Sequence, residues 1–314
     1  MFPQPVLLLL YRTAIAVADT VYDRVGEPGD VLTKTHPQQD ADVDRHSDEE
    51  LLKLSQSVPD KQWASSGAPL RLTSGVVAKL VPRPLTGWPS EALAQELVHK
   101  RTSIPVPAIQ RVIHLDEDGS VIIMDHIPGI TLAEAWPTMT LWQKIRTALT
   151  LRSYVRQLRS IQHPQSHIPG PPREGEEAGR CFAPHIFGPM RPTQGPFPTS
   201  DDLSQFFNHA MNEAALTRLC SHKGPLPDDG TLVFSHVDLA LHNLIVGKDG
   251  HLWLIDFATV GFYPQWFEYV NMRMEAEVEF GKEYDWVWNA ILPFVCDPYF
   301  SIYDWITTVA PDYL

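Results

Sequence analysis

The chain has 314 residues, which is enough to bury a full hydrophobic core and predicts one large or two modest domains. Apolar residues make up 44% of the sequence and charged residues 20%, a balance that excludes a chain disordered throughout. The formal net charge of −13 argues against a nucleic-acid-binding protein, because such a surface needs a basic patch to neutralise phosphates.

The chain starts with a short apolar run, residues 6–10, that is followed closely by Arg12. No basic region precedes this run, and it is too short to cross a bilayer, so we expect neither a signal peptide nor a transmembrane segment. The apolar residues that follow recur at helical spacing and predict a helix packed on the first domain, with contact to a membrane surface as the alternative. The face expected to pack is formed by Leu9, Ala14, Ala16, Val17 and Val21.

Residues 70–73 and 76–81 are two apolar runs separated by Ser74 and Gly75, a pattern that predicts a β-hairpin. The second run carries Lys79 between apolar neighbours, where a lysine is unusual because lysines are rarely buried unless they are paired. One interpretation is an edge-strand lysine with its ammonium group in water. The other is a lysine that binds a ligand.

A strand is expected at residues 121–124, and helices are expected at residues 141–161 and 200–219 from their apolar spacing. Between these two helices, residues 163–200 contain nine prolines and five glycines, too many chain breakers for a helix or a central strand. We expect either a substrate-facing loop or a surface linker there.

The most informative motif is His236-x-Asp238-Leu239-x-x-x-Asn243, followed by Asp256-Phe257, which matches the catalytic loop of a kinase. Asp238 would orient an acceptor hydroxyl and take its proton, while Asn243 and Asp256 offer the hard oxygen ligands that Mg²⁺ prefers. Residues 244–246 and 252–255 read as two strands joined by an Asp-Gly turn. This hairpin would return Asp256 to a position beside Asn243.

With these residues the chain resembles the aminoglycoside phosphotransferase and choline-kinase-like family, particularly its fungal-type branch. The branch signature Thr-Ser-Ile-Pro-Val-Pro is found at residues 102–107. Residues 124–132 resemble the family's lobe hinge, and residues 261–268 resemble the segment after its metal-binding aspartate. The matches run in order from about residue 75 to about residue 269. The chain departs from the pattern at Val237, where the family usually has glycine.

The resemblance implies an α+β, two-lobe protein-kinase-like fold that binds ATP and Mg²⁺ in the cleft between the lobes. The small antiparallel-sheet lobe would comprise residues 1–124, and the larger, mainly helical lobe residues 125–314. Lys79 would bind the phosphates and pair with a glutamate of the next helix. Glu91 is expected to be that glutamate, since Glu96 lies on another helical face.

The same resemblance implies roles for the remaining site residues. Backbone groups of Asp125 and Ile127 would hydrogen-bond adenine, and Asn243 and Asp256 would hold the metal. His236 is expected to brace the loop, and His242 either shapes the loop or contacts phosphate. Zinc is not expected at this histidine pair, because no third ligand follows at suitable spacing.

We expect the chain to transfer the γ-phosphoryl group of ATP to a hydroxyl of a small molecule. A protein kinase is disfavoured, because the chain after Asp256 has neither the D-F-G sequence nor a nearby A-P-E motif. Two alternatives remain open: a nucleotide-binding pseudokinase or scaffold, and the transfer of another nucleotide-derived group such as AMP.

The acceptor is expected to be a cation or, alternatively, a neutral hydroxylated metabolite. Carboxylates and aromatic rings alternate after Asp256 and would suit an amine through charge pairing and cation–π contact. The carboxylates are Glu268, Glu275, Glu277, Glu279, Glu283 and Asp285, and the aromatic residues are Tyr263, Trp266, Phe267, Tyr269, Tyr284, Trp286 and Trp288.

The cysteines favour a reducing compartment, so we expect a cytoplasmic protein. Cys181, Cys220 and Cys296 are widely spaced and odd in number, which speaks against a disulfide framework or a structural zinc site.

Overall fold

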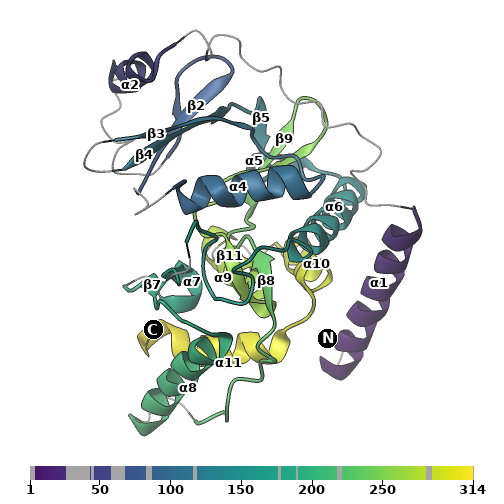
Figure 1. Ribbon diagram of the computed structural model, residues 1–314. Coiled ribbons are helices and arrows are strands. Elements are labelled where there is room, and N and C mark those ends of the chain that lie inside the picture. The colour runs from purple at the N-terminus through teal and green to yellow at the C-terminus, as the bar shows by residue number, and fades with distance from the viewer. Residues whose placement is uncertain are drawn as a thin grey trace.

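A computed structural model describes residues 4–25, 43, 46–57, 68–82, 87–115, 119–175, 178–188, 190–217, 221–280 and 285–313. A four-stranded antiparallel sheet with its helices forms a small lobe, and a larger, mainly helical lobe lies below it in Figure 1. The expected α+β fold, with a small antiparallel-sheet lobe and a larger, mainly helical lobe, is confirmed.

The small-lobe sheet has the strand order β1 (Leu70–Arg71), β2 (Val76–Val81), β4 (Ser120–Asp125) and β3 (Ile109–His114). Strands β1 and β2 form the predicted hairpin, although its first strand is shorter than expected. In the pairing of β2 with β4, Lys79 lies opposite Ile122. Lys79 is therefore in a central strand and not on an edge.

The two faces of this sheet are covered by different helices. Successive side chains of β2 point to opposite faces, so neighbouring residues contact different helices. Helix α2 (Asp48–Ser57) packs over the face that carries Val76 and Ala78, where Leu51 is fully buried. Helix α4 (Ser90–Arg101) covers the other face, with Ala92 against Val81. Lys79 shares its face with Val81 and therefore points toward α4.

The segment between the lobes builds a second, three-stranded sheet of order β10-β9-β5. Strand β5 (Gly129–Thr131) is followed by the short helix α5 (Leu132–Ala135), which Thr131 and Glu134 cap reciprocally. Strands β9 (Leu244–Gly247) and β10 (Leu252–Leu254) form the predicted hairpin. Its turn uses Gly250 at φ 82°, a left-handed conformation that glycine adopts without strain.

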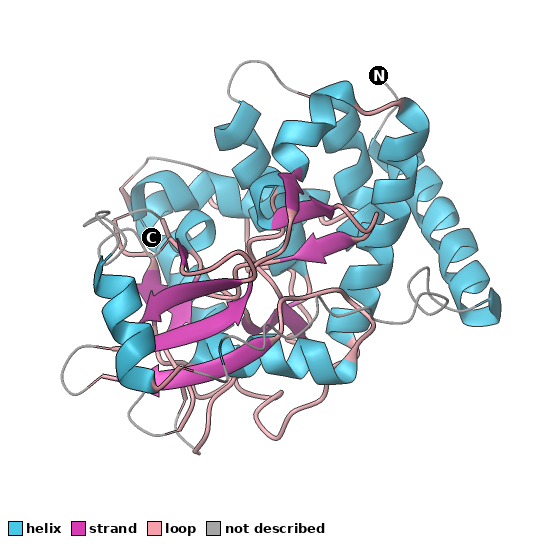
Figure 2. Ribbon diagram, turned by 90° about the horizontal axis from the view of Figure 1, so that it is seen from above, coloured by secondary structure: helices cyan, strands magenta, loops and turns pink. Residues whose placement is uncertain are grey.

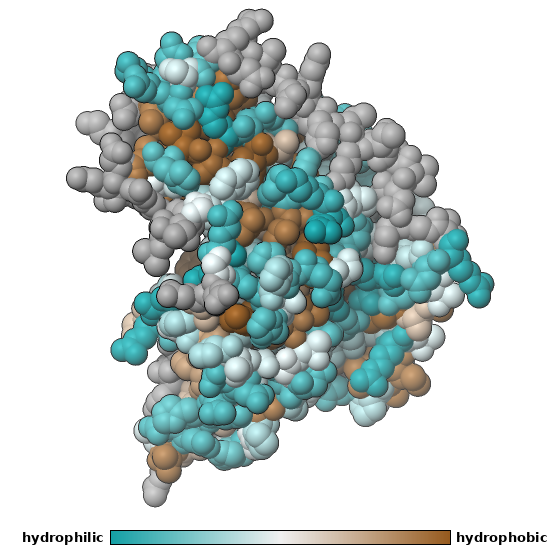
Figure 3. Space-filling view, in the orientation of Figure 1, coloured by the Kyte–Doolittle hydropathy of each residue, from teal (hydrophilic) through white to brown (hydrophobic). Residues whose placement is uncertain are grey.

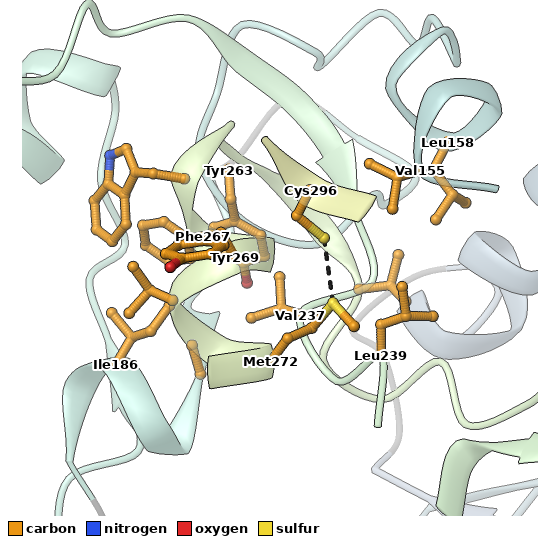
Figure 4. Packing of buried hydrophobic residues seen from close by; sticks show 14 of the residues in the cluster. Val155, Leu158, Ile186, Val237, Leu239, Tyr263, Phe267, Tyr269, Met272 and Cys296 are labelled. Carbon is orange, nitrogen blue, oxygen red and sulfur yellow. Dashed lines mark hydrogen bonds between the residues drawn. The ribbon is translucent and has the colours of Figure 1, made fainter. Parts of the chain in front are cut away.

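The large lobe is built mainly from helices, as the view from above in Figure 2 shows. They pack around one hydrophobic core. Its longer helices are α6 (Leu141–Arg159), α8 (Ser200–Leu216), α9 (Trp266–Phe280), α10 (Trp286–Cys296) and α11 (Phe300–Tyr313), and β8 (Leu232–Ser235) pairs with β11 (Gly261–Pro264). In Figure 4, Val155 of α6 lies in the same core as Met272 of α9 and Cys296 of α10. The Cys296 thiol donates to Met272 Sδ over 3.2 Å.

The proline-rich segment is more ordered than its composition predicts. Strands β6 (Cys181–Phe182) and β7 (Thr193–Gln194) form a small hairpin around helix α7 (Pro184–Phe187). The backbone of Gly170 also bridges to Phe262 of β11. The expectation that no helix forms in this segment was wrong, because the β6–β7 pairing, the bridge to Phe262 and the burial of Ile186 and Phe187 compensate for the chain breakers.

Helix α1 (Gln4–Val25) packs on the large lobe, so the expectation that it packs on the small lobe was wrong. Tyr11 donates from its hydroxyl to the Ala290 carbonyl at 2.7 Å, and Tyr22 donates to the Leu149 carbonyl at 2.9 Å. Asp19 pairs with the buried Arg152 at 2.7 Å. The helix therefore turns its polar and aromatic face inward, and the face expected to be buried is exposed.

By length and composition alone, residues Gln4–Arg24 of α1 pass the test for a helix that could cross a membrane. The expectation of no transmembrane segment was based on the apolar run at residues 6–10 alone, which is much shorter than this helix. A signal sequence or a core helix of a soluble protein passes the same test, so the result by itself assigns no membrane span.

The two described cysteines, Cys181 and Cys296, are free and buried. Cys220 lies outside the described residues.

Candidate active site

Lys79 connects the two lobes through ion pairs. Its Nζ lies 2.6 Å from Glu91 Oε1 of α4 and 2.9 Å from Asp256 Oδ1, which follows β10. Burial alone would lower the pKa of Lys79, but these two carboxylates raise it. The lysine is therefore charged. Glu96 instead pairs with Lys100 at 2.7 Å on the exposed side of α4.

Asp238 and Asn243 meet through the short 3₁₀ helix Leu241–Asn243. Asn243 Nδ2 donates to Asp238 Oδ2 at 2.7 Å and to the Asp238 carbonyl at 2.9 Å, which fixes both side chains. Burial raises the pKa of Asp238, and Glu275 and Asp256 add to this against the lowering effect of His236 and His242. A raised pKa brings a carboxylate closer to the range useful for a general base.

The β9–β10 hairpin brings Asp256 back to the catalytic loop. The backbone N–H of Ile255 donates to the Asn243 carbonyl at 3.0 Å, so Asp256 follows directly beside Asn243. Asp256 has φ 62° and also accepts from the Ala258 N–H at 3.2 Å. Although burial alone would raise it, the pKa of Asp256 is lowered by the charge of Lys79. The carboxylate is ionised.

Glu268 of α9 holds the catalytic loop from beneath. Its carboxylate accepts from the backbone N–H of His236 at 2.6 Å and from that of Val237 at 3.1 Å. These two bonds fix the backbone at Val237, which has φ 59° in the place where the resembling family has glycine. Burial raises the pKa of Glu268 to about 6, although the two N–H groups lower it.

His236 is fully buried against the Phe257 ring, with centroids 5.2 Å apart, and burial lowers its pKa. Its carbonyl accepts from Thr259 Oγ1 at 2.8 Å. A neutral, enclosed ring braced in this way suits the structural role expected for this histidine.

The hinge residues lie at and after the end of β4. The Asp125 carboxylate accepts from Gln110 Nε2 at 2.6 Å and from the Ala108 N–H at 3.2 Å, so this side chain braces the hinge. The N–H of His126 donates to the Gly75 carbonyl at 2.7 Å. Ile127, the other residue expected near adenine, is buried.

A divalent cation could be held by oxygen atoms of Asn243 and Asp256. Within the described ranges there is no group of three or more His, Cys, Asp and Glu residues that could hold a metal. Mg²⁺, however, commonly binds through one or two protein ligands and takes its remaining ligands from phosphates and water. An amide oxygen and an ionised carboxylate fit this requirement.

A second pair of ionisable groups lies near Asp238. His185 of α7 contacts Glu275 of α9 through Nε2 and Oε2. The hydrogen bond to Glu275 raises the pKa of His185 despite its burial, and Asp238 raises it further. The proline-rich segment thus contributes a histidine with a raised pKa near Asp238. Sequence reasoning missed His185, because no motif precedes or follows it.

Several residues expected to bind a cationic acceptor have other roles. Glu268 is buried under the catalytic loop, and Asp285 caps α10 and accepts from Trp136 Nε1 at 2.8 Å. Glu277 accepts from the Tyr303 hydroxyl at 2.6 Å. Most of the aromatic rings belong to the core: Tyr263, Trp266, Phe267, Tyr269 and Trp288 are buried. The side chain of Glu279, and both Glu283 and Tyr284, lie outside the described residues.

No known protein-family model matches the chain. No curated protein matches it either. Among solved structures it is similar to a mutant aminoglycoside 2′-phosphotransferase IIIa bound to GDP, with 11% identity over 76% of each chain and a TM-score of 0.47.

Two further similar structures are a phosphotransferase for aminoglycosides and one for macrolides. Aminoglycoside phosphotransferase APH(3″)-Id from Streptomyces rimosus, with ADP and streptomycin, shares 16% identity over 83% of this chain and 96% of that chain, with a TM-score of 0.42. Macrolide 2′-phosphotransferase MphH from Brachybacterium faecium shares 12% identity over 74% of each chain, with a TM-score of 0.41.

Proposed function

We propose that this chain is a phosphotransferase that moves the γ-phosphoryl group of ATP to a hydroxyl group of a small molecule. The observation that supports it most is the meeting of Lys79 with Asp256 at 2.9 Å, because these residues come from different lobes and lie 177 positions apart. Together with Glu91, they bring a phosphate-binding cation and an ionised oxygen ligand to the catalytic loop.

Each site residue then has a defined task. Lys79 binds the nucleotide phosphates, and the backbone of Asp125 and Ile127 positions adenine. Asn243 and Asp256 hold Mg²⁺, which when bound supplies positive charge to the phosphates. Asp238 accepts the proton of the acceptor hydroxyl as its oxygen bonds to the γ-phosphorus, while the bond from that phosphorus to the bridging oxygen breaks and ADP leaves.

We further propose a neutral hydroxylated acceptor in preference to a cationic one. Of the carboxylates expected to attract a cation, Glu268, Glu277 and Asp285 already have partners within the protein. Glu275 is already paired with His185. The ring of His185, near Asp238, can donate a hydrogen bond to a second acceptor oxygen. Membership of the fungal-type branch remains part of this proposal.

A product assay separates this function from its alternatives. Purified protein would be incubated with ATP, Mg²⁺ and, in turn, neutral polyols, choline, ethanolamine and aminoglycosides, and the products would be weighed by mass spectrometry. Phosphoryl transfer adds roughly 80 mass units to the acceptor. Transfer of AMP adds a larger mass, and a pseudokinase or scaffold leaves every acceptor unchanged.

The decisive variant is Asp238→Asn, which preserves the size of the side chain but removes the base. It should lower turnover by roughly two to four orders of magnitude. Turnover equal to that of the wild type would exclude Asp238 as the base and with it the proposed reaction. A preference for cationic acceptors that is lost in Glu275→Gln would instead exclude the neutral acceptor.

A further inference from the structure

The outward face of α1 is apolar along most of its length. Leu9 is 66% exposed, Val17 is 61% exposed and Val21 is 49% exposed. Of the most apolar 18 residues of the helix, only 11% are buried, so α1 is not a core helix. In Figure 3, brown side chains mark this face at the lower right edge of the molecule. The face is an exposed, mainly apolar stripe that also carries Thr13, Thr20, Arg12 and Arg24.

The threonine hydroxyls on this stripe donate their hydrogen bonds within the helix and not to water. Thr13 donates its hydroxyl to the Leu9 carbonyl at 2.9 Å, and Thr20 donates to the Ala16 carbonyl at 2.7 Å. Each threonine therefore satisfies its own donor within the helix and presents its methyl group outward. In an apolar environment this arrangement avoids the cost of an unpaired hydroxyl.

The charges of α1 are sorted between its faces. Asp19 pairs with Arg152 and Arg156, and Asp23 pairs with Arg156 at 2.6 Å, so both acids are compensated by the large lobe. The other two charged residues, Arg12 and Arg24, are basic and exposed. In a chain of net charge −13, this apolar stripe carries a local positive charge. The charge of each arginine acts over a Debye length of about 10 Å.

We infer that the outward face of α1 binds the surface of an anionic lipid bilayer, with the helix lying in the plane of the interface. An apolar stripe flanked by basic residues is the combination that inserts among lipid headgroups. The helix of 22 residues would lie along the surface for about 33 Å. This inference goes beyond the proposed phosphotransfer and does not depend on it.

The inner contacts of α1 favour a helix that stays docked on the large lobe rather than one that crosses the bilayer or is removed. Crossing would break the hydrogen bonds of Tyr11 and Tyr22 and would take Asp19 from Arg152, which is buried. Removal of α1 as a signal sequence would break the same bonds. Arg152 would keep Asp297 at 2.8 Å but would lose Asp19, one of its two carboxylate partners, and the loss of a partner from a buried ion pair is destabilising.

The test is vesicle co-sedimentation of the full chain. The vesicles would be phosphatidylcholine alone and phosphatidylcholine with 30% phosphatidylserine. The variant Leu9→Glu/Val17→Glu removes the apolar stripe at exposed positions, and Arg12→Gln/Arg24→Gln removes its charge. The matched control is Leu216→Glu on α8, where an equally exposed leucine, 76% accessible, lies away from α1.

We expect the wild type and Leu216→Glu to bind the anionic vesicles. Leu9→Glu/Val17→Glu should lower the bound fraction at least about tenfold, with an unchanged melting temperature. The arginine variant should bind anionic vesicles no better than neutral ones. Failure of the wild type to bind, or equal binding by all variants, would overturn the inference. Self-association that is lost in Leu9→Glu/Val17→Glu, without vesicle binding, would show that a second copy covers this face.

Discussion

Lys79 Nζ and Asp256 Oδ1 lie 2.9 Å apart, although one belongs to the central strand of the small-lobe sheet and the other follows the catalytic hairpin of the large lobe. Glu91 holds the same ammonium group from α4 at 2.6 Å. The three side chains form one network, since each carboxylate contacts the same nitrogen atom. Substitution of any one of them should therefore weaken the interactions of the other two.

Lys79→Met and Glu91→Gln should weaken nucleotide binding by a similar factor, and the double variant should be little worse than either single one. The free-energy effects of substituting two residues in one ion-pair network do not add, because each substitution already disrupts the shared interaction. Glu96→Gln is the control, because its pair with Lys100 is largely exposed and exposed pairs contribute about 0–1 kcal/mol. Calorimetric titration with ADP and Mg²⁺ gives the affinities. Additive losses in the double variant would show that the two residues act separately.

Asp256→Asn should weaken Mg²⁺-dependent nucleotide binding by about 10- to 100-fold, the scale of a lost charged hydrogen bond. Asparagine tolerates the left-handed backbone at this position, φ 62°, so the fold should persist. Asp238→Asn should leave nucleotide affinity nearly unchanged, because Asp238 acts on the acceptor. Titrations with and without Mg²⁺ separate the two roles. An equal loss of Mg²⁺ dependence in both variants would contradict this division.

The parts of the site that could be predicted from sequence are those with local signals. The Asp-Gly turn predicted the hairpin that returns Asp256 to Asn243. Glu91 was favoured over Glu96 by the family resemblance at the start of the helix and by the different helical face of Glu96. The orientation of α1 could not be predicted, because apolar residues occur all around this helix. Its inward face is the one that carries Tyr11, Asp19 and Tyr22. The hydrogen-bond and ion-pair partners of these three residues lie more than a hundred positions away in the sequence.

Glu268 illustrates the same limit. Its role depends on backbone N–H groups 31 and 32 residues earlier, and no sequence pattern separates such a glutamate from one that binds a cation. The position of His185 near Asp238 could not be predicted from the sequence for another reason. It lies in a proline-rich segment whose short strands form only through pairing with each other and through the bridge to β11.

Glu268 should give the protein a pH-dependent loss of stability. Its pKa in the fold is about 6, above the ordinary 4.5, so the folded state binds the proton more tightly than the unfolded state does. Stability from this group is therefore greatest below pH 4.5 and falls by about 2 kcal/mol as the pH rises to 6 and above.

Urea unfolding of the wild type and of Glu268→Gln across this pH range isolates the effect. The wild type minus variant difference in unfolding free energy should fall between pH 4.5 and pH 6.5, because other groups titrate alike in both proteins. A difference that does not change with pH would contradict the buried position of this carboxylate.

His185 and Glu275 should titrate as a pair. The pKa of His185 is raised above 6.5, mainly by its hydrogen bond to Glu275, so its stabilising charge is fully present below pH 6.5 and is lost as the pH rises through the folded value. Glu275→Gln should lower the pKa of His185, measured by histidine NMR titration. His163, whose pKa is lowered by burial, serves as the internal control and should not move. An unchanged His185 in the variant would show that the pair does not form in solution.

Val237 should respond to substitution in the reverse of the usual order. It is buried and has φ 59°, a conformation that costs a non-glycine residue about 1–2 kcal/mol. Val237→Ala loses roughly 1.5 kcal/mol of methyl burial and keeps this strain, whereas Val237→Gly loses more burial but releases the strain. We therefore expect the glycine variant to be at least as stable as the alanine variant.

Val121 is the matched control, because it is equally buried but lies in strand β4. There Val121→Gly should be less stable than Val121→Ala by about 0.5–1 kcal/mol, the ordinary cost of glycine inside a strand. Urea unfolding of the four variants gives the two rankings. If glycine is also the less stable substitution at position 237, the backbone there is not left-handed, and the two hydrogen bonds from His236 and Val237 to Glu268 cannot be what holds it.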